Sequence, residues 1–251
     1  MPDASCEAPG EMLSPGAMKL QPPKIPKKYQ PRGFEILHED RDLIVGRKAA
    51  GFLTVAALWE RENTVHEALN QYVRKGNPRS RKCVYVVHRL DQATTGVLIF
   101  AKSEEVQAYL KNNWKTTVKT YYAIVHGRLP KKSGLIESYL SEDEDYFVQS
   151  SGDSELGKLA QTEYEVIQET GKYSLLRINL LTGRKNQIRV HLADAGAPIV
   201  GDPKYGNPET KFKSLALHAT AMTFTHPFNK ERVTVSTPVP EHFRKLVPFN
   251  Y

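Results

Sequence analysis

The chain has 251 residues, of which 40% are hydrophobic and 25% charged, as is usual for a globular protein in water. Its 35 Lys and Arg residues outnumber 28 Asp and Glu residues, giving a formal net charge of +7 that favours polyanionic partners. No apolar run approaches the ~20 residues of a membrane span, and the first residues lack a secretion signal. The two cysteines, Cys6 and Cys83, have neither disulfide nor metal-ligand spacing. We therefore expect a cytoplasmic protein without membrane contact.

Residues 1–33 are rich in Pro and Gly and show no apolar period. Such a segment buries too little surface to offset the entropy lost on ordering, so we expect a flexible tail. Neither an internal repeat nor an interior linker follows it. Residues 34–251 are therefore expected to form one domain. The acidic stretch at 141–147 within this domain is expected to be a solvated loop.

Short strand-like runs dominate the chain from residue 34 onwards. They cover residues 34–37, 43–46, 52–55, 84–87, 97–101, 121–127, 146–149, 162–167, 173–181, 221–225 and 232–236. Helical spacing of apolar residues is confined to 64–76, 103–114, 186–196 and 240–247. Thr64 and Glu67 have the spacing of a capping box, and Ser103 is an expected N-cap. Many antiparallel-looking strands with separate helices favour an α+β fold built on one extended, mostly antiparallel mixed sheet.

The turn "HRLDQATTG", residues 88–96, lies between two apolar runs and carries both Arg89 and Asp91. Joining two strands requires only turn-forming residues, so Asp91 is explained equally well as a turn former. The neighbouring Arg and His are not small turn residues, however, and catalytic groups often lie on loops that a rigid sheet positions. Both interpretations stay open from the turn alone.

The stretch at 74–82 carries five positive charges and no negative one, directly before this turn. A run of this kind is either a solvated loop or a phosphate-binding segment. Its basic residues are Arg74, Lys75, Arg79, Arg81 and Lys82.

Tyr121 and Tyr122 are adjacent in a predicted strand, so their side chains must point to opposite faces of the sheet. At most one of them therefore packs in the core. Both are explained as packing aromatics, but a ring that lines a cleft would also provide a stacking surface for a base. His191 and His218 have no partners at metal-ligand spacing, which favours structural roles.

Arg184, Lys185 and Arg189 surround the predicted start of the helix at 186–196, where cations oppose the helix dipole. An anion must offset this unfavourable interaction. Water and salt would suffice, but a carboxylate such as Asp91 or an RNA phosphate would stabilise the cluster better. Lys204 and the lysines of 207–214 provide further positive charge for RNA.

Five longer stretches resemble the RluA-type pseudouridine synthases in order and approximate spacing. They are "VHRLDQATTGVLIFAKS", "KTYYAIVHG", "GKLAQTEYEV", "LLTGRKNQIRVHLADAGAPIVGDPKYG" and "LALHA". The resemblance runs from Phe34 to the C-terminus and implies the pseudouridine synthase fold. It also implies an isomerase that converts uridine to pseudouridine in structured ribosomal or transfer RNA without a metal or organic cofactor. We expect it to act as a monomer with RNA as its partner.

The resemblance also implies roles for individual residues. Asp91 matches the aspartate that initiates cleavage of the glycosidic bond, by attack at the sugar or by proton abstraction from it. Arg189 matches the basic residue that pairs with this aspartate. Tyr121 matches the tyrosine that stacks on the uracil and assists proton removal from carbon 5, and Arg89 matches the arginine that replaces the extruded nucleotide in the RNA. The substrate-binding set is completed by His88, Lys48, Arg184, Lys185 and Leu217.

The chain departs from the family pattern at two points. It has "RKAAG" at 47–51, which lacks the proline of the frequent Lys-Pro-x-Gly stretch, and it has Lys185 and Asn186 where a Thr-His pair is common. Both of these side chains are able to donate to phosphate. The alternatives are an RNA-binding homologue or ribosome assembly factor without catalysis, and a nucleoside hydrolase acting on free substrate. Retention of Asp91, Tyr121 and Arg189 argues against the first, and the lack of a metal site or paired acid against the second.

Overall fold

The computed structural model describes residues 18–19, 25–57, 60–206 and 212–249. The strands in this part of the chain are β1 (Met18–Lys19), β2 (Phe34–Glu39), β3 (Leu43–Lys48), β4 (Tyr85–Val86), β5 (Thr95–Ala101), β6 (Val118–His126), β7 (Ser133–Glu142), β8 (Val148–Ser151), β9 (Lys158–Glu169), β10 (Tyr173–Leu180), β11 (Leu217–Thr225) and β12 (Arg232–Ser236). The helices are α1 (Val65–Arg74), α2 (Glu104–Asn112), α3 (Gln187–Asp194) and α4 (Glu241–Leu246), with short 3-10 turns at Lys27–Tyr29 and Trp114–Thr116.

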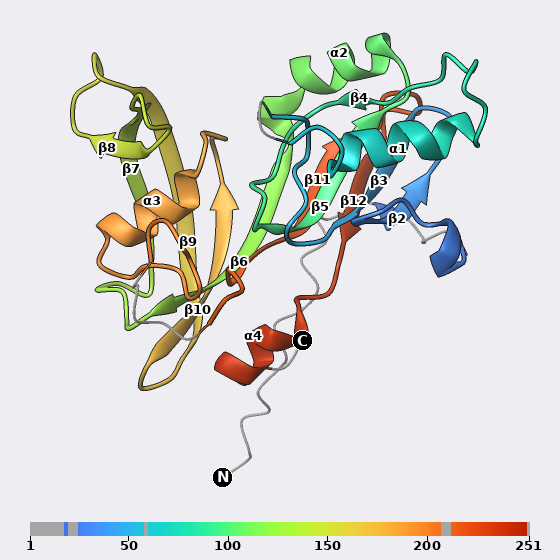
Figure 1. Cartoon of the computed structure of the whole chain (residues 1–251). Coiled ribbons are helices and arrows are strands. Elements are labelled where there is room, and N and C mark those ends of the chain that lie inside the picture. Colours follow the sequence, from blue (N-terminus) through green and yellow to red (C-terminus); the bar gives the residue numbers. More distant parts are fainter. Residues whose placement is uncertain (1–17, 20–24, 58–59, 207–211, 250–251) are drawn as a thin grey trace.

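These strands form one sheet in the order β2-β3-β5-β11-β6-β10-β9-β7-β8, with β12 and β4 paired to β11 and β5. The β5–β11 and β1–β12 pairs are parallel, and the other pairs are antiparallel. The predicted α+β class with a mostly antiparallel mixed sheet is therefore confirmed. Figure 1 shows that β6 passes between two halves of the molecule, one carrying α1 and α2 and the other carrying α3.

The core explains why β5 is a continuous apolar run. Leu98 and Phe100 pack in one cluster with Val65 and Leu69 of α1. The alternate residues, Val97, Ile99 and Ala101, pack in a second cluster with Leu110 of α2. A strand covered on both faces has no solvent side, so the period-2 alternation of polar residues disappears. α1 and α2 therefore enclose this half of the sheet.

The helix ends follow the capping pattern of the sequence. Thr64 Oγ1 accepts a hydrogen bond from the Glu67 amide at 3.1 Å, and Ser103 Oγ accepts one from the Val106 amide at 3.3 Å. α1 ends at Arg74 with Lys75 in the left-handed conformation, one residue before the expected Gly76. Among the described helices, none is long and apolar enough to span a membrane.

Several predicted boundaries are wrong. Residues 52–55 form a loop with a single bridge at Leu53 instead of a strand, and β7 is a strand that the sequence analysis did not predict. Within the expected tail, residues 1–17 and 20–24 lie outside the described part, whereas Met18–Lys19 pair with Val233–Thr234 of β12. The division into a flexible tail and one domain stays a prediction.

Gly96 is needed where the turn at 88–96 enters β5. Its φ is +120°, and a Cβ at this position would lie 2.2 Å from the Ala219 carbonyl oxygen. Only glycine combines this φ with so close a backbone approach. The residue thus brings β5 alongside β11 in parallel pairing and fixes where the preceding turn ends.

Candidate active site

A cleft of about 980 Å³ brings together segments that are far apart in the sequence. It is lined by the loop at 53–57, the turn at 87–94, part of β6, and the segment at 180–189, which leads into α3. The sequence-predicted residues that line it are His88, Arg89, Asp91, Tyr121, Arg184, Lys185, Arg189, Lys204 and Leu217. Asn186, Lys119, Trp114, Glu142 and Tyr146 also line it, although sequence reasoning gave them no catalytic role.

Asp91 lies in a turn that two sets of hydrogen bonds hold in place. Thr54 Oγ1 donates to the Leu90 carbonyl at 3.0 Å and accepts from the Leu90 amide at 3.1 Å, while the Thr94 amide donates to the Asp91 carbonyl at 3.1 Å. The Asp91 side chain is 29% exposed. Its Oδ2 accepts from Asn186 Nδ2 at 2.6 Å and from Arg189 Nη1 at 3.3 Å. Both donors lie on Oδ2, which leaves Oδ1 free of protein donors among the described residues.

Arg189, on the buried side of α3, has a second and closer partner. Its Nε and Nη2 each donate to Asp202 at 2.7 Å, in a bidentate pair. Burial by itself lowers the pKa of Arg189, but Asp202 and Asp91 outweigh it and raise the pKa overall. Burial likewise opposes ionisation of Asp202, and the Arg189 bonds lower the pKa of that carboxyl. The guanidinium is therefore a fixed cation beside Asp91.

Asn186 orients Asp91 through a chain of hydrogen bonds. It adopts the left-handed conformation with φ 52° before α3, and its amide nitrogen donates to Asp91. Tyr205 Oη donates to Asn186 Oδ1 at 3.4 Å and itself accepts from the Val148 amide at 3.1 Å. The amide oxygen thus faces Tyr205 and the amide nitrogen faces Asp91. One hydrogen of the Asn186 NH₂ group is therefore used on the Asp91 carboxylate, and donation to phosphate by the other stays a prediction.

The basic residues before α3 also have protein partners. Lys185 Nζ forms an ion pair with Glu142 of β7. Arg184 Nε donates to the Leu159 carbonyl at 3.0 Å. The charge cluster anticipated at this helix start is therefore offset mostly by carboxylates and carbonyl groups of the chain. Arg184 and Lys185 still line the cleft.

Tyr121 and Tyr122 face opposite sides of β6, as predicted. Tyr121 is 6% exposed and lines the cleft, whereas the Tyr122 ring stacks on Phe249 with centroids 6.5 Å apart and planes 12° apart. Burial and the nearby Asp91 charge raise the pKa of Tyr121. Its hydroxyl therefore keeps its proton at neutral pH.

His88 and Arg89 differ in how accessible their side chains are to a ligand. His88 Nε2 accepts from the Ile99 amide at 3.2 Å, and its ring lies 4.9 Å from that of Trp114. Burial lowers the pKa of His88 to about 3, so the ring is neutral at the edge of the cleft. Arg89 is exposed and forms no ion pair with the described residues. It is thus available to a bound molecule.

Lys48 does not line the cleft, which corrects its assignment as a substrate-binding residue. It is fully buried, and its ammonium donates to the carbonyl groups of Ala49, Phe52 and Gln92 at 2.8 to 3.0 Å. Burial lowers its pKa to about 7. The side chain ties the loop at 49–52 to the residue that follows Asp91 and so supports the turn from behind.

We expect Lys48→Met to lower the free energy of unfolding by about 3 kcal/mol, because three carbonyl groups lose the buried ammonium that is their shared donor, at ~1 kcal/mol each. Urea denaturation measures the change. Lys115→Met, at an exposed lysine, is the matched control and should be neutral. Equal stability of the two variants would contradict a supporting role for Lys48.

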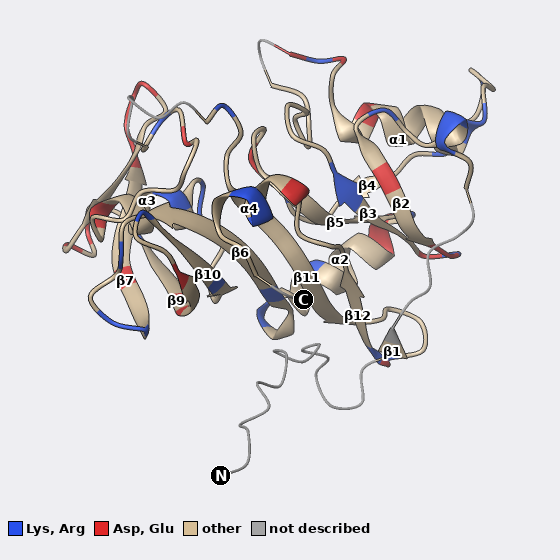
Figure 2. Ribbon diagram, turned by 90° about the horizontal axis from the view of Figure 1, so that it is seen from below, with Lys and Arg blue, Asp and Glu red and all other residues tan. Residues whose placement is uncertain are grey.

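The basic loop at 74–82 does not line the cleft, although it directly precedes the Asp91 turn in the sequence. It follows α1 at the outer edge of the molecule, away from the gap between the two halves (Figure 1). Figure 2 shows that Lys and Arg are spread over both halves and include the C-terminal end of α1. Contact between this loop and a ligand therefore requires a molecule that extends well beyond the cleft.

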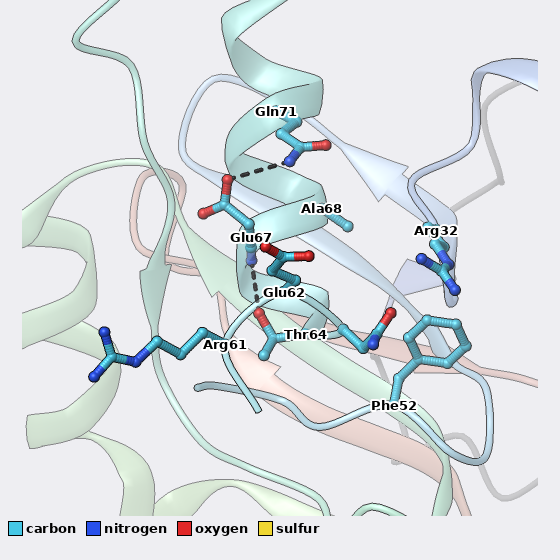
Figure 3. Close-up of a pocket in the computed structure, with 9 residues that line it drawn as sticks. Arg32, Phe52, Arg61, Glu62, Thr64, Glu67, Ala68 and Gln71 are labelled. Atoms are coloured by element: carbon cyan, nitrogen blue, oxygen red, sulfur yellow. Dashed lines mark hydrogen bonds between the residues drawn. The ribbon is translucent and has the colours of Figure 1, made fainter. Parts of the chain in front are cut away.

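A second pocket, of about 420 Å³, lies beside the N-terminal end of α1 (Figure 3). Its lining mixes Arg32 and Arg61 with Glu62 and Glu67, next to the Phe52 ring. Acids and bases offset each other there, and it contains none of the sequence-predicted site residues. The cleft around Asp91 is therefore the candidate active site.

Within the described ranges, no three His, Cys, Asp or Glu side chains form a group that could hold a metal. His191 bonds through both ring nitrogens, to Thr162 Oγ1 at 2.9 Å and Ser138 Oγ at 3.0 Å. His218 Nδ1 bonds to Thr95 Oγ1 at 2.6 Å. Both histidines thus have the structural roles that the sequence indicated.

Comparison with known proteins agrees with this geometry. A family model described as RNA pseudouridylate synthase matches residues 42–194, more than half of the chain. The chain is 33% identical over 214 residues to the dual-specificity RNA pseudouridine synthase RluA of Vibrio cholerae, covering 83% of this chain and 82% of that protein. It is 32% identical over 234 residues to the ribosomal large subunit pseudouridine synthase D of Blochmanniella floridana, covering 85% and 72%.

The fold is also similar to a solved structure. Human RNA pseudouridylate synthase domain containing 4 superimposes with a TM-score of 0.69 at 23% identity, covering 83% of this chain and 89% of that one. At this identity the likeness supports the fold alone, and it agrees with the mixed sheet described above.

Proposed function

The chain belongs to the RluA-type family of RNA pseudouridine synthases, and we propose that it isomerises specific uridines of structured ribosomal or transfer RNA, with Asp91, Tyr121 and Arg189 as its catalytic residues. The observation that carries the proposal is the carboxylate of Asp91, held by Asn186 and Arg189 in the cleft that Tyr121 also lines. The name of the Blochmanniella relative supports ribosomal RNA as the substrate class. The half-buried free thiol of Cys83 supports a reducing cytoplasm.

The chemistry suits a site with a single carboxylate. Isomerisation breaks the bond from the ribose to N1 of uracil and joins the same ribose carbon to C5. C5 loses one proton and N1 gains one, so no water enters the product and no paired acid is needed, in contrast to glycoside hydrolysis. Asp91 starts the reaction, either as nucleophile at the sugar or as the base that takes a sugar proton. These proton and bond transfers require neither a metal nor an organic cofactor.

Tyr121 and Arg89 act on the uracil and on the RNA around it. The raised pKa of Tyr121 means that phenolate is not the resting form at neutral pH. Tyr121 therefore contributes by stacking on the uracil and by passing the C5 proton onward. Arg89, exposed at the turn, occupies the space that the extruded nucleotide leaves in the RNA. Asp91 thus starts the reaction at the nucleotide, and Arg89 keeps the RNA open around it.

The test of the proposal is to map pseudouridines across total RNA from cells with and without the gene. Loss of pseudouridine at one or a few positions, restored by the wild-type gene, is the expected result. An RNA-binding homologue without catalysis would leave the map unchanged. A purified monomer that restores the modification on RNA from the deletion cells would complete the assignment.

Tyr121→Phe and Tyr121→Ala should have different effects. The phenylalanine ring still stacks, so binding of the deletion-cell RNA should be retained while turnover is lost. The alanine side chain neither stacks on the uracil nor supports turnover, so RNA affinity should also fall, by about tenfold for one lost base stack. Filter binding and single-turnover pseudouridine formation measure the two quantities. Small and equal effects of both substitutions would indicate that Tyr121 only packs.

The basic loop at 74–82 should contribute affinity without affecting the chemistry. Neutral replacement of Arg79, Arg81 and Lys82 should weaken binding to every RNA tested. Each lost phosphate contact should also reduce the slope of log affinity against log salt by about 0.7 to 0.9. Turnover of bound RNA should survive, because the loop lies away from the cleft. An unchanged salt slope would show that RNA is held elsewhere, by groups such as Lys204 and Lys213.

A further inference from the structure

Tyr146 is a large aromatic side chain presented openly at the edge of the active-site cleft. It is 57% exposed, and of the exposed large hydrophobic side chains in the described ranges it is the one that lines this cleft. It belongs to the acidic stretch at 141–147, which the sequence suggested was only a solvated loop. The uracil site proposed above uses Tyr121, which lies deeper in the cleft and is almost fully buried.

The turn that carries Tyr146 is held in one conformation. The Asp143 amide donates to the Phe147 carbonyl at 2.9 Å, and Asp143 Oδ1 accepts from the Phe147 amide at 2.7 Å. The Phe147 ring packs against Tyr205 at 4.8 Å between centroids. Tyr146 itself adopts a left-handed conformation with φ 60° between β7 and β8. The ring is thus positioned before any ligand binds.

Two lysines of the cleft secure this position. Lys204 Nζ donates to the Tyr146 carbonyl at 2.7 Å. Lys185 Nζ lies 5.2 Å from the Tyr146 ring centroid and forms an ion pair with Glu142 at the end of β7. One face of the ring therefore carries a cation, and a phosphate beside it would share the Lys185 charge with Glu142. An aromatic face next to a phosphate-binding cation is the combination that recognises a nucleotide.

We propose that Tyr146 stacks on a base of the RNA that neighbours the target uridine, with Lys185 beside the phosphate of that nucleotide. This inference rests on the proposed function, because it adds a second nucleotide position to the same cleft. It makes the tip of the β7–β8 hairpin an element that holds the RNA, while the Asp91 turn carries out the reaction. Any base supplies a π face, so the subsite contributes affinity and position more than it reads one base.

The test compares Tyr146→Leu with Tyr146→Phe on total RNA from cells that lack the gene. The leucine variant should raise the KM for pseudouridine formation by about tenfold, within the range of one lost base stack, with kcat within twofold of wild type. The phenylalanine variant should keep the wild-type KM. Phe228→Leu is the matched control, because Phe228 is 65% exposed with Arg41 4.4 Å from its ring centroid, but lies outside the cleft.

A second measurement does not depend on turnover. An oligouridylate that contains 5-iodouridine is irradiated with the wild-type protein, and the cross-linked peptide is identified by mass spectrometry. An adduct at Tyr146 supports the proposal even if the RNA target assigned above is wrong. The proposal is overturned if cross-links form elsewhere but not at Tyr146, or if Tyr146→Leu matches Phe228→Leu in KM. Equal melting temperatures of the variants establish that each is folded.

Discussion

Asp91→Asn is expected to abolish pseudouridine formation while leaving the fold and RNA binding intact. The amide keeps the size of the side chain and still accepts a hydrogen bond from Asn186, so we expect the turn at 88–96 to keep its conformation. Arg189 keeps its bidentate pair with Asp202. What is lost is the carboxylate, which neither nucleophilic attack nor proton abstraction at the sugar can do without. Pseudouridine formed on the deletion-cell RNA measures the result.

The control for this substitution also removes one negative charge, but at a residue that takes no part in the reaction. Asp145→Asn changes an exposed acid next to Tyr146 at the cleft edge, so its effect on RNA affinity reports charge alone. We expect its turnover to equal that of wild type. If Asp91→Asn turned over at a similar rate, Asp91 would be a turn former and the reaction would have to begin elsewhere. Unaltered thermal melting of both variants excludes unfolding as the cause.

The parts of the fold that the sequence predicts are those determined by local patterns. The Thr64 and Ser103 caps are placed correctly, because a cap depends on residues within one turn of the helix. The strand at 97–101 is recognisable from its continuous apolar run. The run at 52–55 has similar composition but forms a loop, since its backbone is held by Lys48 and by the bridge from Leu53 to Thr64. The bridge from Leu53 to Thr64, and the bond from Lys48 to Gln92 44 residues away, join segments that no local pattern connects.

In the candidate site too, the sequence predicts the residues that lie in local motifs and misses those that meet through packing. Asp91 and Tyr121 are found from the sequence because each lies in a distinctive motif. Asp202 and Tyr205 are missed as partners, because they meet Arg189 and Asn186 only after α3 packs beside the segment at 202–205. The "GDPKYG" stretch belongs to the family resemblance, and the signal that would have found them is its single acid, Asp202, 13 residues after Arg189. Lys48 is misassigned because sequence does not show that its ammonium is fully enclosed by carbonyl groups.

Arg189→Met is expected to lower the free energy of unfolding by about 3–5 kcal/mol and to abolish turnover. The guanidinium is the bidentate partner of Asp202, whose side chain is completely buried, and removing one member of a buried ion pair leaves the other charge without compensation. Arg177→Met is the matched control, because Arg177 pairs with the exposed Glu165. Loss of that surface pair should change stability by about 1 kcal/mol or less. Urea denaturation compares the two variants.

The double variant Arg189→Met with Asp202→Asn separates the structural role of Arg189 from its role beside Asp91. Replacing the buried carboxylate removes the uncompensated charge, so much of the lost stability should return. Turnover should stay lost, because no guanidinium then lies 3.3 Å from Asp91 and the carboxylate is held by Asn186 alone. Recovery of turnover together with stability would mean that Arg189 serves folding only. Recovery of stability without turnover makes the Arg189 cation part of the reaction that Asp91 begins.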